Sequence, residues 1–184
     1  TLQYSANSLI SADGDCDRPL LMDDCGELIR GDILGILAAR ELGVSSIAAP
    51  VSCNTALEKC GFFKQIRRVQ IGSPFVIQAM LELENEQSPA VKLPTTAEII
   101  DNQKKIIAGY EANGGFLLGS KIKNNSTGNI LLPLPTRDAL LPLLTIMAAS
   151  SKRNLTLSEI VRQLPARFTH SGILRDFPSE TGHK

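Results

Sequence analysis

Apolar residues are arranged in two patterns along this chain of 184 residues, short continuous runs and repeats at helical spacing. Some apolar runs are short and bounded by turn residues, as buried strands are, at residues 46–51, 67–71, 106–108 and 116–118. Other stretches repeat apolar residues at helical spacing, at residues 32–42, 54–59, 75–84, 97–105, 137–151 and 157–164. Strands that alternate with helices predict an α/β fold, here a three-layer α/β/α domain with a mostly parallel mixed sheet and helices on both faces.

Several residues mark where these helices begin and end. We expect Asp32 to cap the first helix and Gly43 to end it. Pro74 stands at a favoured first-turn position of the next long helix. Thr156 and Glu159 stand three residues apart and predict a capping box.

Residues 1–30 have a different pattern. Extended segments predict a hairpin-like unit with an acidic turn at one end, at residues 8–12, 19–22 and 27–29. Further along, the polar, proline-containing stretch near residues 85–105 predicts a surface insertion. The polar residues 179–184 predict a linker.

Composition narrows the classes of function. The chain carries 19 basic and 19 acidic residues, so its formal net charge of +0 offers no field that attracts nucleic acid or an anionic membrane. With 4% aromatic residues it also lacks a platform for stacking bases. Its apolar runs are too short to span a bilayer. We therefore expect neither a nucleic acid nor a membrane as a partner.

The cysteines and the first residues indicate the cellular context. The cysteines show no CxxC spacing, which favours reduced thiols over a disulfide scaffold, at Cys16, Cys25, Cys53 and Cys60. The first residues contain no signal-peptide pattern, and we expect a cytoplasmic protein. The missing initiator Met suggests a processed chain or an excised piece of a longer one.

The sharpest chemical feature is the run D-G-D-C-D-R near the start of the chain. Alternate carboxylates at Asp13, Asp15 and Asp17 point oxygens to one side, which suits a hard divalent cation. A solvated acidic turn is the plain structural alternative. A calcium EF-hand is a poor alternative, because it needs Gly where Arg18 stands and Glu where Asp24 stands. A guanidinium such as that of Arg18, next to a cation site, can hold a phosphate group.

This run, followed by a hairpin and by G-D-I-L at residues 31–34, resembles the metal loop D-G-D-x-D-R of the α-D-phosphohexomutases. The resemblance implies that Asp13, Asp15 and Asp17 ligate Mg²⁺ together with a phosphoserine from another domain. It also implies that Arg18 contacts the phosphoserine region.

A second run, G-Y-E-A-N-G-G at residues 109–115, is similar to the family's sugar-recognition loop, G-E-x-S-G-H. The resemblance implies that Glu111, Asn113 and Gly114 bind the sugar. Asn113 replaces the family's Ser, and Gly115 replaces its His. Because the turn consists of small residues, we expect the Glu111 carboxylate to face a solvated cleft rather than the core.

A third run, Q-I-G-S-P, begins at Gln70 and is similar to the family's K-T-G-H segment. Gln70 stands where the family has a Lys that is a candidate proton carrier, and a Gln side chain performs no acid–base chemistry. Arg67 or Arg68 is an alternative proton carrier. The pair Arg137 and Asp138 resembles the start of the last long helix of the family's third domain.

The family's domain layout places these runs in a larger enzyme. It assigns residues 1–30 to the end of the second domain, residues 31–178 to the third domain, and residues 179–184 to a linker. The family's phosphoserine loop, T-A-S-H-N-P, does not occur in the sequence. The resemblance therefore implies a fragment of a phosphohexomutase, with a hexose phosphate and the remaining domains of the same chain as partners. The favoured activity is that of a phosphomannomutase, which interconverts mannose 1-phosphate and mannose 6-phosphate.

Two alternatives stay open. A non-catalytic binding or assembly domain could keep this fold, and Gln70 and Gly115 favour that interpretation. The intact set of Asp13, Asp15 and Asp17 favours the enzyme. An amino-sugar phosphate is the alternative substrate, and the chain by itself is expected to be inactive.

Overall fold

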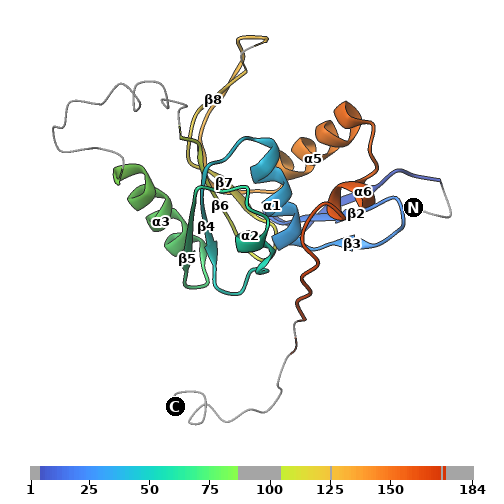
Figure 1. The fold of residues 1–184 in the computed structure, drawn as a ribbon, viewed down its shortest axis with the longest axis horizontal. Helices are drawn as coiled ribbons and strands as arrows, with labels where there is room; N and C mark the ends of the chain where they lie inside the picture. Colours follow the sequence, from blue (N-terminus) through green and yellow to red (C-terminus); the bar gives the residue numbers. More distant parts are fainter. Residues whose placement is uncertain (1–4, 87–104, 125, 171, 173–184) are drawn as a thin grey trace.

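A computed structural model of the chain describes residues 5–86, 105–124, 126–170 and 172. Its centre is a five-stranded sheet in the order β10-β7-β6-β4-β5 (Figure 1). The strands are β4 (Ser46–Pro50), β5 (Gln65–Val69), β6 (Ile107–Tyr110), β7 (Phe116–Leu118) and β10 (Leu134–Asp138). Strand β4 pairs in parallel with β5 and β6, whereas β7 pairs antiparallel with β6 and β10. Every strand of this sheet except β7 runs in the same direction, which confirms the mostly parallel mixed sheet.

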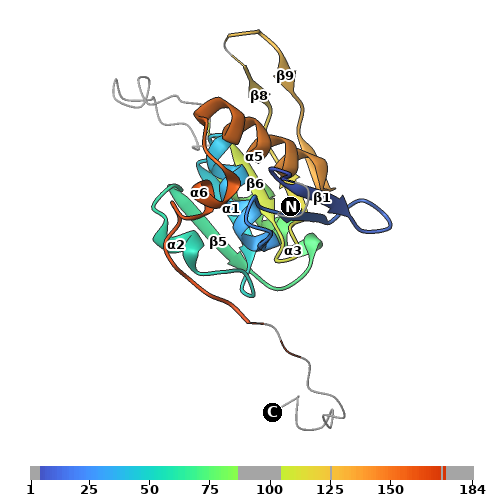
Figure 2. The same cartoon turned by 90° about the vertical axis from the view of Figure 1, so that its right-hand side faces the viewer.

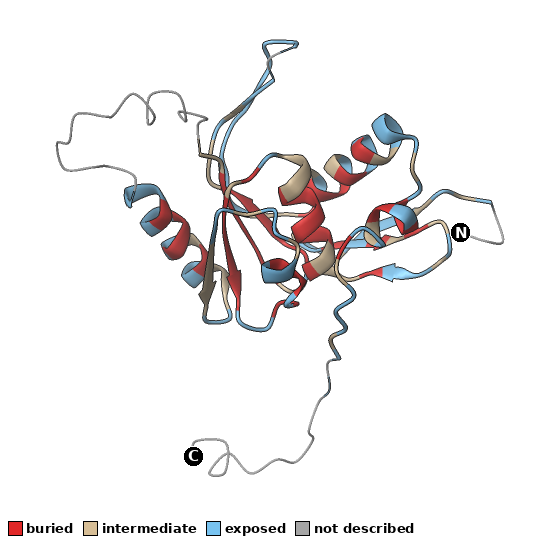
Figure 3. Cartoon of the chain, in the orientation of Figure 1, coloured by how far each residue is buried: buried red, intermediate tan, exposed pale blue. Residues whose placement is uncertain are grey.

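Helices cover both faces of the sheet. The long helices are α1 (Gly31–Glu41), α3 (Ser73–Asn85) and α5 (Leu140–Arg153). Figure 1 shows α1 and α5 on one side of the strands and α3 on the other. Successive residues of a strand point to opposite faces, so Ile47 and Ala49 pack with α1 and α5, while Ala48 packs with α3. The buried residues concentrate in the sheet and on the inward sides of the helices (Figure 3), and the three-layer prediction is confirmed.

Smaller elements surround this core, namely α2 (Ala56–Lys59), α6 (Leu157–Val161), β8 (Ile122–Lys123) and β9 (Ile130–Leu131). Strands β8 and β9 pair antiparallel and form a hairpin that projects away from the sheet (Figure 2). This hairpin was not predicted from the sequence, because two-residue strands that are largely exposed give no periodic pattern. No described helix has the length and apolar character needed to cross a membrane.

The N-terminal segment forms a separate antiparallel sheet in the order β1-β2-β3, as expected. Its strands are β1 (Leu9–Ala12), β2 (Pro19–Met22) and β3 (Leu28–Ile29). The turn after β2 is fixed to the start of α6, because Asp24 Oδ1 accepts from the backbone N–H of Ser158 at 2.9 Å and Oδ2 accepts from its hydroxyl at 3.0 Å. The capping box of Thr156 and Glu159 is present at the same helix start, as predicted.

The prediction that Asp32 caps α1 is wrong. The helix begins at Gly31 after Arg30, and Asp32 lies inside the first turn with its side chain fully buried. Its Oδ2 accepts a hydrogen bond from the backbone N–H of Asn54 at 2.9 Å. Asp32 therefore joins α1 to the loop after β4, and this tertiary hydrogen bond takes the place of a cap.

The predicted helix start at Arg137 is also wrong. Arg137 and Asp138 are the last residues of β10, and α5 begins at Leu140. Asp138 Oδ1 accepts from the backbone N–H of Leu140 at 2.8 Å, so it helps to start the helix from outside it.

Other predicted boundaries are shifted or lie outside the described residues. Strand β5 occupies residues 65–69 in place of 67–71, and α6 ends at Val161 in place of residue 164. The expected helix over residues 97–105 and the linker at residues 179–184 fall outside the described part, apart from residue 105. The same holds for the insertion near residues 85–105, apart from its ends.

The contact between Asp24 and Ser158 predicts a pH-dependent stabilisation. Burial raises the pKa of the Asp24 carboxyl, but its hydrogen bonds with Ser158, with its own backbone and with Thr156 together outweigh burial and hold the pKa below its usual value. A lowered pKa means that the ionised carboxyl stabilises the fold above about pH 4, and that this stabilisation is lost as the pH falls further. Asp24→Asn should lower the free energy of unfolding by about 1 kcal/mol at pH 7.

Urea unfolding at pH 7, 5 and 3.5 measures the difference in the free energy of unfolding between the wild type and Asp24→Asn. This difference should become smaller only at pH 3.5. A difference between variant and wild type that stays constant at all three pH values would contradict the role of the Asp24 charge.

Candidate functional site

The acidic turn between β1 and β2 gathers its carboxylates. One oxygen from each of Asp13, Asp15 and Asp17 lies within 4.8 Å of the others. The backbone N–H of Cys16 donates to the carbonyl oxygen of Asp13 at 3.1 Å, and Cys16 adopts a left-handed conformation with φ of 59°. This conformation lets the chain reverse tightly. The three predicted metal ligands therefore lie together in space.

Arg18 forms ion pairs with two of the three aspartates of the acidic turn. Its Nε lies 3.2 Å from Asp13 Oδ2 and 3.1 Å from Asp17 Oδ1. Its backbone N–H also donates to Asp13 Oδ1 at 3.2 Å. Asp15 is exposed and makes no ion pair with any residue that the structure describes. The turn thus has two carboxylates paired with Arg18 and one that faces solvent.

The predicted sugar loop is a tight turn between β6 and β7. The backbone N–H of Glu111 donates to the carbonyl oxygen of Gly115 at 3.0 Å, and that of Gly114 donates to the carbonyl oxygen of Glu111 at 2.9 Å. Asn113 Oδ1 accepts from the backbone N–H of Gly115 at 3.0 Å. One part of the Asn113 amide therefore stabilises the turn itself.

The turn after β6 packs against the start of α1 and against the proline that follows the acidic turn. A Cβ on Gly31 would lie 2.3 Å from the backbone nitrogen of Gly114, closer than real atoms approach. Gly114 has φ of +93°, and a Cβ there would lie 2.8 Å from Pro19 Cγ. Because Pro19 directly follows Arg18, the acidic turn is anchored beside the turn after β6. Only glycine fits at both contact positions.

Arg137, at the end of β10, connects the two loops through charge. Its Nη2 lies 2.5 Å from Asp17 Oδ2, and its Nη1 lies 3.7 Å from Glu111 Oε2. The stem of this side chain lies over Gly115, where a Cβ would be 3.0 Å from Arg137 Cγ. From the sequence, Arg137 was expected only near the start of a helix, with no role in the site. The absence of a side chain at Gly115 was the available signal, since it leaves room for a long neighbour.

Two buried carboxylate oxygens of this cluster, Asp17 Oδ1 and Glu111 Oε2, accept no hydrogen bond from the described residues, although each lies near a guanidinium nitrogen, at 3.1 Å from Arg18 Nε and 3.7 Å from Arg137 Nη1. Glu111 is only 7% exposed, so the expectation that its carboxylate faces a solvated cleft is wrong. The carboxylate lies instead beneath the guanidinium of Arg137. Buried oxygens that retain acceptor capacity are what a ligand hydroxyl or a cation would use.

The alternative proton carriers have partners elsewhere. Gln70 follows β5 and is exposed. Arg67 pairs with Glu86 at 2.5 Å, and Arg68 pairs with Glu58 at 2.7 Å. The hydrogen bond from Arg68 is the main reason that the pKa of Glu58 is lowered. Both guanidinium groups are thus engaged as ion-pair partners and act as structural groups here.

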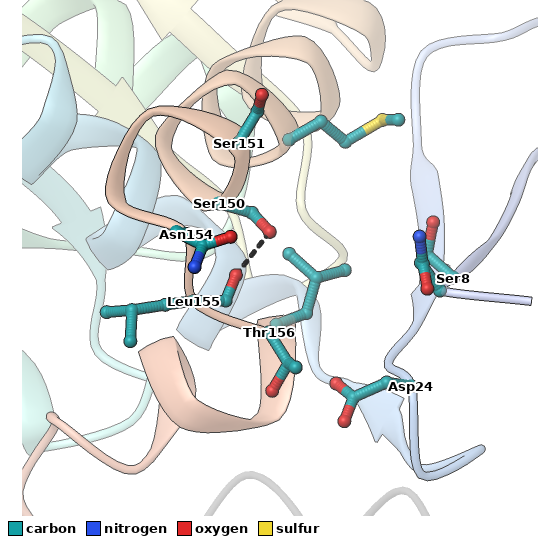
Figure 4. A pocket seen from close by; sticks show the side chains of 10 residues that line it. Ser8, Asp24, Ser150, Ser151, Asn154, Leu155 and Thr156 are labelled. Atoms are coloured by element: carbon teal, nitrogen blue, oxygen red, sulfur yellow. Dashed lines mark hydrogen bonds between the residues drawn. The ribbon is translucent and has the colours of Figure 1, made fainter.

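A separate polar cleft lies between the start of β1 and the corner from α5 to α6 (Figure 4). Its carboxylate, Asp24, has both oxygens bonded to Ser158, and the hydroxyl of Ser150 donates to the carbonyl oxygen of Leu155 at 2.6 Å. Because these polar groups satisfy one another, the cleft serves as a joint between the N-terminal sheet and the helices. The acidic turn and the turn after β6 form the better candidate site.

The fold and this site together define a domain of the phosphohexomutase type, in which an acidic turn meets a glycine-rich turn beside an α/β/α core. The chain belongs to the phosphoglucomutase/phosphomannomutase family, and residues 30–168 match the family's alpha/beta/alpha domain III.

Similar proteins agree with this assignment. The chain is 42% identical over 179 residues to a phosphomannomutase of Salmonella muenchen, covering 97% of this chain and 33% of the relative. It is 34% identical over 177 residues to a phosphomannomutase of Sinorhizobium fredii, covering 96% of this chain and 33% of the relative. The chain thus spans about a third of the length of these curated relatives.

A solved structure shares the fold. The Aspergillus fumigatus N-acetylphosphoglucosamine mutase, solved in complex with GlcNAc-6P and magnesium, superposes with a TM-score of 0.56 at 16% identity. The superposition covers 86% of this chain and 33% of that one.

The contact of Gly114 with Pro19 can be tested by adding a methyl group. Gly114→Ala adds strain at positive φ and also a steric clash, so it should lower the free energy of unfolding by about 3 kcal/mol or more. Gly61→Ala is a matched control, because Gly61 also has positive φ, at +70°, but has nothing within 4 Å of its added Cβ. The control should cost only about 1–2 kcal/mol.

Urea unfolding of both variants gives the comparison. Equal losses of stability in the two variants would show that the two loops are not held by this close contact.

Proposed function

We propose that this chain provides the Mg²⁺-binding loop and the sugar-binding loop of a phosphomannomutase that interconverts mannose 1-phosphate and mannose 6-phosphate. The observation that carries the proposal is the meeting of Asp17 and Glu111 at one guanidinium, Arg137. A cation at the acidic turn and a sugar at Glu111 would therefore be immediate neighbours. Phosphoryl transfer requires this arrangement, because the charge that develops on the phosphate must be neutralised beside the bound sugar.

The donor set fits magnesium. Mg²⁺ takes oxygen ligands at 2.0–2.1 Å in octahedral geometry, so ligand oxygens are spaced by roughly 2.9–4.2 Å. The oxygens of Asp13, Asp15 and Asp17 lie within 4.8 Å of one another, and a small closure of the turn would bring them to that spacing. When bound, Mg²⁺ would supply electrostatic stabilisation of the transferring phosphoryl group.

The chain's own residues would bind and orient the substrate. The Glu111 carboxylate has about four acceptor sites on its two oxygens, and Oε2 lacks a hydrogen-bond partner in the described part of the chain, so the group can accept from a sugar hydroxyl and from Arg137 at the same time. Asn113 uses its oxygen within the turn, which leaves its NH₂ as a donor for a second sugar oxygen, and Gly114 lets the backbone approach closely. Arg18, with its side chain 46% exposed, can turn a guanidinium edge toward a phosphoserine oxygen.

The phosphoserine and the last phosphate-binding site would come from other domains of the same protein. In this proposal residues 1–30 close the second domain, residues 31–178 form the third, and residues 179–184 begin a linker. A cytoplasmic location agrees with the four free thiols of the chain. Mannose phosphate is favoured over an amino-sugar phosphate because two phosphomannomutases match nearly the whole chain.

A chimaera tests the proposal. This chain replaces the matching third of the Salmonella muenchen phosphomannomutase, and turnover of mannose 1-phosphate and of glucosamine 1-phosphate is measured with Mg²⁺. The chimaera should convert the mannose substrate preferentially. Asp15→Asn should lower its kcat by about 10²–10³-fold, because metal stabilisation of the transition state is worth several kcal/mol.

Asp24→Asn is the matched control, since it makes the same chemical change in the same N-terminal sheet but outside the acidic turn. It should leave kcat within about twofold, since its effect is on stability. A folded chimaera that binds mannose 6-phosphate without turnover would instead favour the non-catalytic binding domain, as Gln70 suggests.

A further inference from the structure

Arg137 forms an ion pair with Asp17, a carboxylate that would be needed to bind a cation at the acidic turn. Both oxygens of Asp17 face guanidinium groups: Oδ1 lies 3.1 Å from Arg18 Nε, and Oδ2 lies 2.5 Å from Arg137 Nη2. A divalent cation that binds Asp17 must approach one of these oxygens. Its charge would then repel the guanidinium beside it.

The two arginines differ in where they can go. Arg18 belongs to the acidic turn and is tied to Asp13 in that turn by its Nε and by its backbone N–H. Arg137 comes from β10 and has a second acceptor, Glu111 Oε2, only 3.7 Å from its Nη1. That oxygen is buried and has no hydrogen-bond partner within the described residues. A short movement of the Arg137 guanidinium would replace the lost ion pair with a direct bond to Glu111.

We propose that Arg137 is a positioning residue that holds Asp17 when no divalent cation is present and passes to Glu111 when a cation enters the acidic turn. The proposal rests on the proposed function, because it takes the acidic turn as the metal site. Whether a metal ion is bound then decides whether Arg137 pairs with Asp17 or with Glu111, so this one side chain links the metal loop to the sugar loop. Such linkage is reciprocal: any change at Glu111 that attracts Arg137 also favours the cation.

The charges of the cluster support an exchange of cations. The cluster contains four carboxylates, those of Asp13, Asp15, Asp17 and Glu111, and the two guanidinium groups of Arg18 and Arg137, which pair with all of the carboxylates except that of Asp15. Four negative charges against two positive ones leave two negative charges, which one divalent cation balances. Arg137 therefore needs to move only from one carboxylate to the next, and it stays within the cluster.

The first experiment measures Mn²⁺ affinity of the complete 184-residue chain from the electron paramagnetic resonance signal of free Mn²⁺. Arg137→Gln removes the competing charge and should lower the Kd by about three- to tenfold. Arg137→Lys keeps the charge and should stay within about twofold of wild type. Arg153→Gln is the matched control, since Arg153 pairs with Glu41 at the far end of α5, and it should leave the Kd unchanged.

An unchanged or higher Kd in Arg137→Gln would overturn the proposal, since it would show that Arg137 does not compete with the cation. A purely structural role would lower the melting temperature without this gain in affinity, so melting curves of the same samples are recorded.

The second experiment needs no variant. Mg²⁺ is titrated into the isotope-labelled wild-type chain, and nuclear magnetic resonance follows the side-chain signals of the acidic turn, Arg137 and Glu111. The Arg137 Nε–Hε signal and the Glu111 carboxylate carbon should shift with the same midpoint as the Asp17 carboxylate. If the aspartate signals shift while those of Arg137 and Glu111 do not, the exchange is refuted and the metal site stands. If no aspartate signal shifts, the metal site and the exchange both fail.

Discussion

The backbone of Gly114 rests against Gly31 so closely that neither position has room for a side chain. Gly31 is the first residue of α1, and the N-terminal sheet with its acidic turn immediately precedes it. Gly114 belongs to the turn after β6, near the middle of the main sheet. This contact therefore fixes the end of the N-terminal sheet that carries the acidic turn, while the bonds from Ser158 to Asp24 fix that sheet to α6. The position of Asp17 beside Glu111 depends on it, and so does the span that Arg137 has to bridge.

Ion pairs with two arginines stabilise the carboxylates that the backbone contact brings close together. Carboxylates from two loops would repel one another if they were brought together without cations. The guanidinium groups of Arg18 and Arg137 supply the positive charge. Since Arg137 comes from β10, the acidic turn, the turn after β6 and the end of β10 all meet in one cluster. The cluster remains negatively charged, which suits a divalent cation. Oxygens supplied by another domain would complete the coordination of that cation in the whole enzyme that we propose.

Much of the fold could be predicted from local pattern. The strand periods of β4 and β6, the helical repeat of α3 and the capping box at Thr156 depend on residues close together in the sequence, and the structure confirms them. The features that were missed depend on distant partners. Asp32 has the chemistry of a helix cap, but the N–H of Asn54 binds it instead. Arg137 stands before a helical pattern, yet pairing with β7 draws it into a strand.

In the candidate site, too, the features formed by neighbouring residues could be predicted, and those that depend on distant residues could not. The acidic turn could be found from its run of residues, because alternate aspartates in one turn meet locally. The burial of Glu111 and its link to Asp17 could not, because they depend on contacts between residues far apart in the sequence, namely those of Gly31 with Gly114 and of Arg137 with both carboxylates. A glycine in place of a larger residue signals space, but the sequence does not state which side chain fills it.

The central claim is that one cation and one sugar bind side by side at these two loops. A crystal of the chain grown with Mn²⁺ and mannose 6-phosphate, with anomalous diffraction recorded at the manganese edge, tests it most directly. We expect an anomalous peak within coordination distance of Asp13, Asp15 and Asp17, and a sugar hydroxyl hydrogen-bonded to Glu111. A manganese peak elsewhere, or a sugar bound away from Glu111, would contradict it.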